Sequence, residues 1–320
     1  MKQYRLNLSF IAILSIAFWE GSSSAQDSVH STKNPEQIIV RNLGPNVNSK
    51  AEDFGAYLFS NGLTMYFVSR RQPSSRSNQD QFWVVKRKNR DSAWGEPIFL
   101  KALNNESAVG GITVDDSSKI YFATNYKTTT QNDVNIWEGT IENKTLNIKS
   151  LPSPVNTERW ESQPSVTGDG KQLYFASNRD HQIGTNGRVE IFITHKNSEG
   201  KWSEPKNVGL HINLGTYNGT PFISSDNNIL FFTSSINLGS KKKIYISSRI
   251  GPKDDDWSEA QLLPGEINSD GDNLFPMIAN DGKTIYFSSN RSGGFGGFDI
   301  YEATLPEDIQ AKIFHSFPGY

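Results

Sequence analysis

The sequence predicts an all-β protein, a single five-bladed β-propeller of four-stranded antiparallel blades. The first observation is an aromatic pair that recurs five times, at intervals of 55, 53, 57 and 55 residues. The second is that the same flanking residues surround each pair. Even spacing over such a length is typical of folds that stack one structural unit. The pairs begin at Tyr66, Tyr121, Tyr174, Phe231 and Tyr286.

The flanking residues define four short apolar runs in each copy. An Asn lies eighteen residues before the aromatic pair in four copies, and the second copy is one residue shorter there. These residues are Asn48, Asn104, Asn156, Asn213 and Asn268. A second apolar-aromatic pair follows the first, at Phe82, Ile136, Ile191, Ile244 and Ile300. A Trp-x-Glu motif closes copies one, three and four, at Trp94, Trp202 and Trp257.

Turn residues separate the apolar runs. The pairs Asp169-Gly170 and Asp281-Gly282 supply the positive φ angles of tight hairpins. β-Branched and aromatic residues fill the runs, as half-buried strands require, and we find no convincing apolar period of 3.6 residues. Four antiparallel strands per copy, arranged radially, leave few exposed strand edges and form a propeller.

The last blade requires a strand from elsewhere in the chain. Copy five ends near Leu305 without a Trp-x-Glu motif, and the apolar segment 37–43 precedes copy one. We predict that this segment pairs with residues 284–304 and closes the ring, at a modest cost in loop entropy. The alternative is an open array with a loose N-terminal strand. Residues 37–305 then form the propeller, and residues 306–320 form a C-terminal tail.

The N-terminal residues predict export. Lys2 and Arg5 precede an apolar run from Phe10 to Trp19, and Ala25 ends a small-residue cleavage pattern. We therefore expect a signal peptide over residues 1–25, a linker over 26–36, and a periplasmic or secreted monomer. The run is too short for a membrane span, so we expect no transmembrane anchor. The chain has no cysteine, which excludes disulfides and thiolate chemistry.

The charge balance indicates no polyanionic partner. Without the signal peptide, 30 basic and 33 acidic residues remain. This balance favours neither nucleic acid nor an anionic membrane. The basic run Lys241-Lys242-Lys243 is typical of a solvated hairpin loop.

Copy five resembles a known family of repeats. The pattern from Asp281 to Tyr301 is similar to the TolB-like, WD-like propeller repeats of bacterial envelope proteins, and copy three is nearly as similar. The resemblance covers residues 43–304. It implies a propeller fold and a non-enzymatic interaction module, and many such proteins carry a further peptidoglycan-binding domain that this chain lacks.

Two arginines follow the aromatic pairs of copies three and five. Each is followed by an acid before the next strand, which suggests the ion pairs Arg179–Glu190 and Arg291–Asp299. Copies two and four have lost both members of the pair together. We therefore expect structural, bidentate ion pairs within these blades.

Other motifs argue against common enzyme classes. The Gly-rich segment 292–297 leads into a strand and not into a helix, so it does not form a phosphate loop. Asp270 and Asp272 alternate like the start of a calcium loop, but the Gly and the closing Glu of such a loop are missing. Calcium near these two residues is a weak possibility, and we expect no other cofactor or metal. His181, His195, His211 and His315 lack metal-ligand spacing, and no serine-hydrolase elbow is present.

The positions just before and at the start of the innermost strands vary from copy to copy. They should gather around the mouth of the central channel, where function is most readily added to a shared scaffold. Trp160 belongs neither to the Trp-x-Glu series nor to the aromatic position of the second pair, which Trp83 and Trp137 occupy, so it is either an exposed platform or a buried loop anchor. The candidate binding residues are Glu52, Asp53, Trp160, Glu161, Tyr217, Asn218, Asp272 and Asn273.

Two functional classes follow from these residues. The first is an exported, non-enzymatic module that binds an envelope protein or a surface glycan at the channel mouth. The second is a glycosidase in which Asp53, Glu161 or Asp272 supply the acid and the base or nucleophile. A glycosidase requires two carboxylates roughly 5–9.5 Å apart. We favour the first class and assign no catalytic residue.

Overall fold

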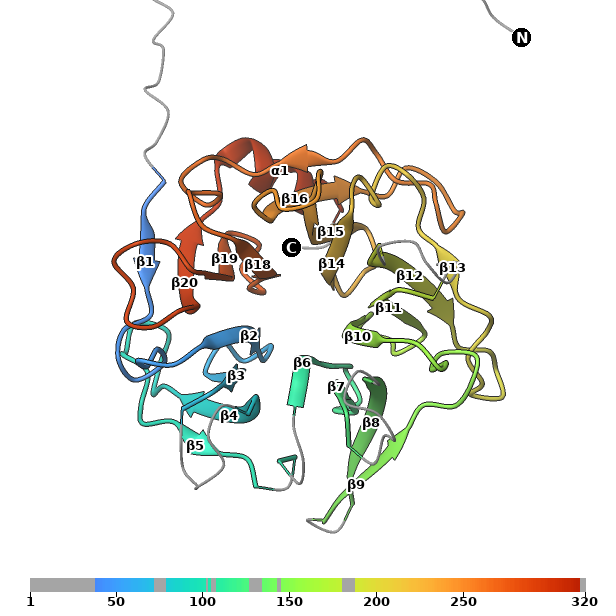
Figure 1. Ribbon diagram of the computed structural model, residues 1–320, viewed down its shortest axis with the longest axis horizontal. Coiled ribbons are helices and arrows are strands. Elements are labelled where there is room, and N and C mark those ends of the chain that lie inside the picture. The colour runs from blue at the N-terminus through green and yellow to red at the C-terminus, as the bar shows by residue number, and fades with distance from the viewer. Residues whose placement is uncertain are drawn as a thin grey trace, which may run out of the picture. The chain divides into compact units, whose positions relative to one another are not determined.

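The computed structural model forms a closed ring of five sheets around a central axis (Figure 1). It describes residues 38–71, 79–101, 103–104, 108–126, 134–142, 145–179 and 188–316. The expected signal peptide, the linker and Gln37 lie outside the described residues, as does His181. The prediction of five four-stranded antiparallel blades is confirmed.

Blades 1 to 4 run from an innermost strand to an outermost strand in chain order, and blade 5 takes its outermost strand from the N-terminal segment. Blade 1 contains β2 (Asp53–Leu58), β3 (Thr64–Ser69), β4 (Gln81–Lys86) and β5 (Ile98–Phe99). Blade 2 contains β6 (Ala108–Val114), β7 (Ile120–Thr124), β8 (Asn135–Glu142) and β9 (Thr145–Ser150). Blade 3 contains β10 (Glu161–Val166), β11 (Gln172–Ser177), β12 (Glu190–His195) and β13 (Lys206–Asn207). Blade 4 contains β14 (Tyr217–Ile223), β15 (Ile229–Ser235), β16 (Lys243–Ser248) and β17 (Gln261–Leu262). Blade 5 contains β18 (Asn273–Ile278), β19 (Thr284–Ser289), β20 (Asp299–Thr304) and β1 (Val40–Asn42).

The ring closes through the N-terminal strand, as predicted. β1 pairs antiparallel with β20, and the register sets Val40 opposite Ala303 and Asn42 opposite Tyr301. Figure 1 shows β1 beside β20 at the outer edge of the last blade. Early and late parts of the propeller therefore share one sheet.

The recurring Asn ties each blade to the connection that follows it. Asn268 accepts a hydrogen bond from the Ile244 backbone N–H at 2.7 Å and donates one to the Ile244 carbonyl at 2.9 Å. Its amide thus extends the pairing of the short fourth strand, β17, along the third strand, β16. The same two bonds recur in all five copies, from Asn48 to Ile300, Asn104 to Phe82, Asn156 to Ile136, and Asn213 to Ile191.

The Trp-x-Glu tryptophans pack between blades together with a cation. Lys196 lies 4.4 Å above the Trp202 ring and donates to the Tyr121 hydroxyl of the preceding blade at 2.9 Å. Arg249 makes the equivalent contacts with Trp257 and Tyr174. The tryptophan series is therefore part of the scaffold, as its recurrence predicted.

A helix occupies part of the expected tail. The helix α1 (Glu307–Ser316) places Ile309 and Ile313 in the buried cluster that contains Phe231 of blade 4. Figure 1 shows α1 beside blade 4. No convincing apolar period of 3.6 residues marks this segment in the sequence. Ile309 and Ile313 are the buried apolar residues among those of the helix whose side chains are described, and Pro306 followed by two acids is a typical helix start.

We expect Asn268→Ala to lower the free energy of unfolding by about 1–3 kcal/mol, because it leaves the buried N–H of Ile244 without a partner and removes the bonds to the Ile244 and Leu263 carbonyls. Urea denaturation followed by tryptophan fluorescence measures this change. Asn237→Ala, at an exposed hairpin position, is the matched control and should leave stability unchanged. Equal stability of the two variants would contradict a structural role for the recurring Asn.

Candidate functional site

The innermost strands all begin at the same end of the ring. We call this end the mouth face. Its described parts are the connections 43–52, 151–160, 208–216 and 263–272, together with the hairpins 236–242 and 290–298. All eight predicted binding residues belong to this end of the ring.

The two acids that start innermost strands are buried and hydrogen-bonded. Asp53 accepts from the backbone N–H and the hydroxyl of Ser49 at 2.6 and 2.7 Å. Glu161 accepts from the backbone N–H and the hydroxyl of Thr157 at 2.9 and 2.7 Å. Neither side chain is exposed to solvent. Burial raises the pKa of Glu161, although the bonds from Thr157 and the charge of Arg179 act in the opposite direction.

The equivalent amides in blades 4 and 5 are also buried. Asn218 accepts from the Leu214 backbone N–H at 3.0 Å and from the Ser234 hydroxyl at 2.8 Å. Asn273 donates to the Gly271 carbonyl at 2.9 Å. The first residues of β2, β10 and β18 and the second residue of β14 therefore shape the connections before them, and the structure does not present these four side chains to a partner.

The predicted ion pair of Arg179 with Glu190 is wrong. Arg179 Nη2 lies 3.4 Å from Glu161 Oε1, and its guanidinium stacks over the Phe175 ring. Glu190 instead accepts from the Asn207 side chain at 2.8 Å. The arginine turns toward the axis because β10 pairs with β11, which sets Glu161 opposite the end of the strand that precedes Arg179.

The predicted ion pair of Arg291 with Asp299 is wrong for the same reason. Arg291 donates to the Asn273 side chain at 3.0 Å. Asp299 accepts from the Phe295 backbone N–H at 2.5 Å and from the Asn42 side chain at 2.8 Å. The sequence carried a signal for the correct partner, since Arg and the first residue of the innermost strand recur together in copies one, three and five.

Blade 4 departs from this arrangement. Ile236 occupies the position of the arginine and is 46% exposed, so no guanidinium ties this hairpin to the scaffold. Leu214 occupies the position of Ser49 and Thr157, and it packs against the apolar core of the blade. The hairpin 236–242 stands over a cavity of about 350 Å³. The lining residues are Thr216, Tyr217, Ser235, Leu238, Gly239, Ser240, Lys241, Lys242 and Asp272.

This mouth cavity brings two predicted residues, Tyr217 and Asp272, into one site. Lys242 Nζ lies 3.7 Å from the Asp272 carboxylate and 5.3 Å from the centre of the Tyr217 ring. The backbone N–H of Lys242 donates to Asp272 at 2.9 Å. The Tyr217 hydroxyl is hydrogen-bonded to Gln163 at 3.1 Å, and burial raises the pKa of Tyr217 to about 12. Tyr217 is therefore a neutral hydrogen-bonding group at physiological pH.

The two remaining predicted residues serve other connections. Glu52 accepts from the Phe298 backbone N–H at 3.2 Å, as Asp272 does from Lys242. Trp160 is half-buried, and its backbone N–H donates to the Asn178 side chain at 3.1 Å. The structure does not place Glu52 or Trp160 in the lining of the mouth cavity.

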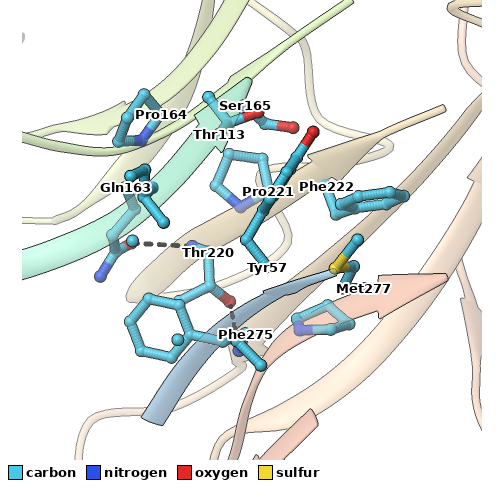
Figure 2. Close-up of a pocket in the computed structure, with 15 residues that line it drawn as sticks. Tyr57, Thr113, Gln163, Pro164, Ser165, Thr220, Pro221, Phe222, Phe275 and Met277 are labelled. Atoms are coloured by element: carbon cyan, nitrogen blue, oxygen red, sulfur yellow. Dashed lines mark hydrogen bonds between the residues drawn. The ribbon is translucent and has the colours of Figure 1, made fainter. Parts of the chain in front are cut away.

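The centre of the ring is nearly filled. Every innermost strand carries an irregular register at its midpoint, and three residues of each strand surround a cavity of about 30 Å³. Figure 2 shows Pro164, Pro221 and the Phe275 ring among its lining. No carboxylate lies among these lining residues, all of which are described. The central channel therefore offers too little space for a sugar ring.

Hydrogen bonds between blades hold this centre together. The Thr220 backbone N–H donates to Gln163 at 2.7 Å, and the Phe275 backbone N–H donates to the Thr220 hydroxyl at 3.1 Å (Figure 2). The φ angles are 56° for Gln163, 44° for Thr220 and 51° for Phe275. Positive φ angles of this size lie in the left-handed region, which favours glycine. Each of these residues precedes a proline that lines the cavity. Contacts from the neighbouring blade stabilise this strained backbone conformation.

In the described part of the chain, no three His, Asp or Glu side chains lie close enough together to hold a metal ion. Asp272, half of the expected calcium position, is engaged with Lys242. The one helix within the described ranges is too short and too polar to cross a bilayer.

Comparison with known proteins supports the fold. No protein-family model matches the chain, and no curated protein matches its sequence. TolB from Acinetobacter baumannii is similar in structure, with 13% identity and a TM-score of 0.49; the match covers 84% of this chain and 64% of TolB. An endo-arabinase from Bacteroides thetaiotaomicron has 11% identity and a TM-score of 0.52, over 82% of this chain and 96% of the arabinase. This chain spans 64% of the length of TolB, and its likeness to the endo-arabinase is one of fold.

We expect Asp53→Asn to lower the free energy of unfolding by about 2 kcal/mol. The substitution removes the charge-assisted bond to Arg71, which measures 2.7 Å, and leaves that guanidinium buried without its counter-ion. Thermal unfolding followed by circular dichroism measures the effect. Lys50→Gln, on the exposed part of the same connection, is the control. An unchanged melting temperature for Asp53→Asn would show that the acid is not a structural anchor.

We expect Glu161→Gln to change how stability depends on pH. Because the folded pKa of Glu161 is raised above its ordinary value of 4.5, the folded state binds its proton more tightly than the unfolded state. The contribution of Glu161 to stability is therefore present below pH 4.5 and is lost as pH rises through the folded pKa. Wild type should lose up to about 1.4 kcal/mol per pH unit in this interval relative to Glu161→Gln. Urea titrations at several pH values test this, and parallel profiles would contradict it.

Proposed function

We propose that this protein is an exported, non-enzymatic module that binds a glycan in the mouth cavity between blades 4 and 5. One observation carries the proposal. The cavity opens beneath a hairpin of blade 4 that lacks the arginine of blades 1, 3 and 5 and is joined to blade 5 through the backbone of Lys242. Function is readily added at such positions because the surrounding fold tolerates change there.

The lining suits a sugar. Its volume of about 350 Å³ lies at the lower end of the range for small-ligand pockets. The hydroxyl groups of Thr216, Ser235 and Ser240 line the cavity together with charged side chains. Polar groups of this kind suit the many hydroxyl groups of a sugar ring. The side chain of Leu238 offers an apolar surface for the C–H groups of the sugar ring.

A glycosidase is the competing class, and the endo-arabinase shows that an enzyme can share this fold. The cavity lining contributes a single carboxylate, Asp272, which Lys242 already neutralises. Asp53 and Glu161 are buried at the starts of other strands. Since two opposed carboxylates are needed for glycoside hydrolysis, we propose binding without cleavage.

A protein partner is the second candidate for the same face. Leu238 is 78% exposed and Phe295, on the neighbouring mouth hairpin, is 48% exposed. Exposed apolar side chains on adjacent loops are typical of interaction surfaces. The concave polar cavity beside them favours the glycan.

We expect Ser240→Trp to abolish glycan binding, because the indole would fill the mouth cavity. The measurement is affinity electrophoresis of the protein in gels that contain arabinan, dextran, polygalacturonate or alginate. Ser198→Trp, on an exposed hairpin at the opposite end of the ring, is the matched control and should retain binding.

The same polysaccharides also test the enzymatic alternative. Release of reducing ends during incubation with wild type would support the glycosidase class. Equal retention of Ser240→Trp and wild type would place binding elsewhere. Retention of wild type in none of the four gels would overturn the proposed function.

A further inference from the structure

We infer that the sugar held in the mouth cavity carries a carboxylate, so that the glycan is built from uronic acids. The inference rests on the proposed function and names the class of ligand. It follows from the charges and the hydrogen-bond donors that the cavity leaves unused.

The charges of the cavity lining do not balance. Two ammonium groups, Lys241 and Lys242, face a single carboxylate, Asp272. Lys242 and Asp272 neutralise one another at 3.7 Å, and the Lys242 backbone N–H also holds the carboxylate. One positive charge remains, and a ligand with one negative charge per sugar would neutralise it.

The third lysine of the basic run does not contribute to this balance. Lys243 Nζ donates to the backbone carbonyls of Asn268 and Ser269, at 3.0 and 2.5 Å, in the connection to blade 5. Its role is therefore structural, and the charge available to a ligand comes from Lys241.

Lys241 is free to bind. Its side chain is exposed at the rim, and no residue within the described ranges forms a hydrogen bond or ion pair with its ammonium group. An ammonium group offers three donors, and an anionic oxygen is the partner that gains most from them. A Lys–carboxylate contact at this rim would be partly shielded from water by the hairpin.

The neutral groups of the cavity are arranged as acceptors. The Thr216 hydroxyl donates to the Ser235 carbonyl at 3.2 Å, and the Ser240 hydroxyl donates to the Asn237 carbonyl at 2.7 Å. The lone pairs of the Thr216 hydroxyl oxygen can accept bonds from sugar hydroxyls, whereas the Ser240 oxygen already accepts from the Asn237 backbone N–H at 3.1 Å. The protons of both hydroxyl groups are already used, so the strongest remaining donor is Lys241. A carboxylate, which only accepts, is the complementary group.

The test compares polysaccharides that differ only in the charge of the carboxyl group. Polygalacturonate and alginate are the charged probes, and their methyl ester and propylene glycol ester are the neutral counterparts. We expect wild type to bind at least one charged probe about tenfold more tightly than its ester, as expected for one charge-assisted hydrogen bond. Binding should weaken as salt is raised from 50 to 300 mM because the contact lies near the surface.

Variants of one residue locate the effect. Lys241→Gln should lose the tenfold preference and keep the weaker binding of the esters, whereas Lys241→Arg should retain the preference. Lys283→Gln is the control, since it removes an exposed charge at the opposite end of the ring. Melting temperatures of all variants should match wild type, because Lys241 makes no contact that supports the fold.

The outcomes separate the two proposals. Equal binding of charged and esterified probes would overturn the carboxylate inference and leave glycan binding intact. Equal binding of dextran sulfate and the uronic acid polymers would show attraction to any polyanion, which also overturns it. Failure to bind any polysaccharide would overturn both.

Discussion

The fold depends on one repeated interaction, the side-chain amide of an Asn that bonds both the N–H and the C=O of a residue in the preceding blade. An innermost strand can begin only where the connection before it is held in place. Because the amide satisfies a buried backbone donor and acceptor together, no other uncharged side chain of similar size can replace it. The Asn recurs 17 or 18 residues before the aromatic pair in every copy, so each connection is held in the same way.

A second set of repeated contacts adds to this interaction. In blades 1 and 3, a Ser or Thr hydroxyl, an acid and an arginine form a chain from the connection to the stacked aromatic rings, as in Ser49, Asp53 and Arg71. Blade 5 keeps the arginine and replaces the acid by Asn273. Blade 4 replaces all three groups, and a cavity of about 350 Å³ lies beneath its mouth hairpin. The candidate site thus lies beneath the hairpin 236–242, which lacks these three anchoring groups.

Sequence reasoning predicted the blades and their closure correctly because these depend on regular patterns. It assigned the wrong partners to Arg179 and Arg291 because those acids are near in sequence, whereas the actual partners become neighbours only through strand pairing. It did not predict α1, whose buried residues Ile309 and Ile313 are recognised only from their contacts with the apolar core. Of the eight candidate binding residues, Tyr217 and Asp272 share the mouth cavity, and four others are buried. The lysines that complete the lining were interpreted as a solvated loop.

By itself, the sequence determined the number of blades, the strands within each, and the closure by the N-terminal segment. It could do so because each depends on local periodicity or on the spacing of like residues. The tertiary structure alone decided which polar residues are anchors and which are open to a ligand. That distinction depends on burial and on contacts between blades, since identical side chains such as Asp53 and Asp272 have opposite environments. Packing also decided that the centre of the ring is closed and that the open space lies at its mouth.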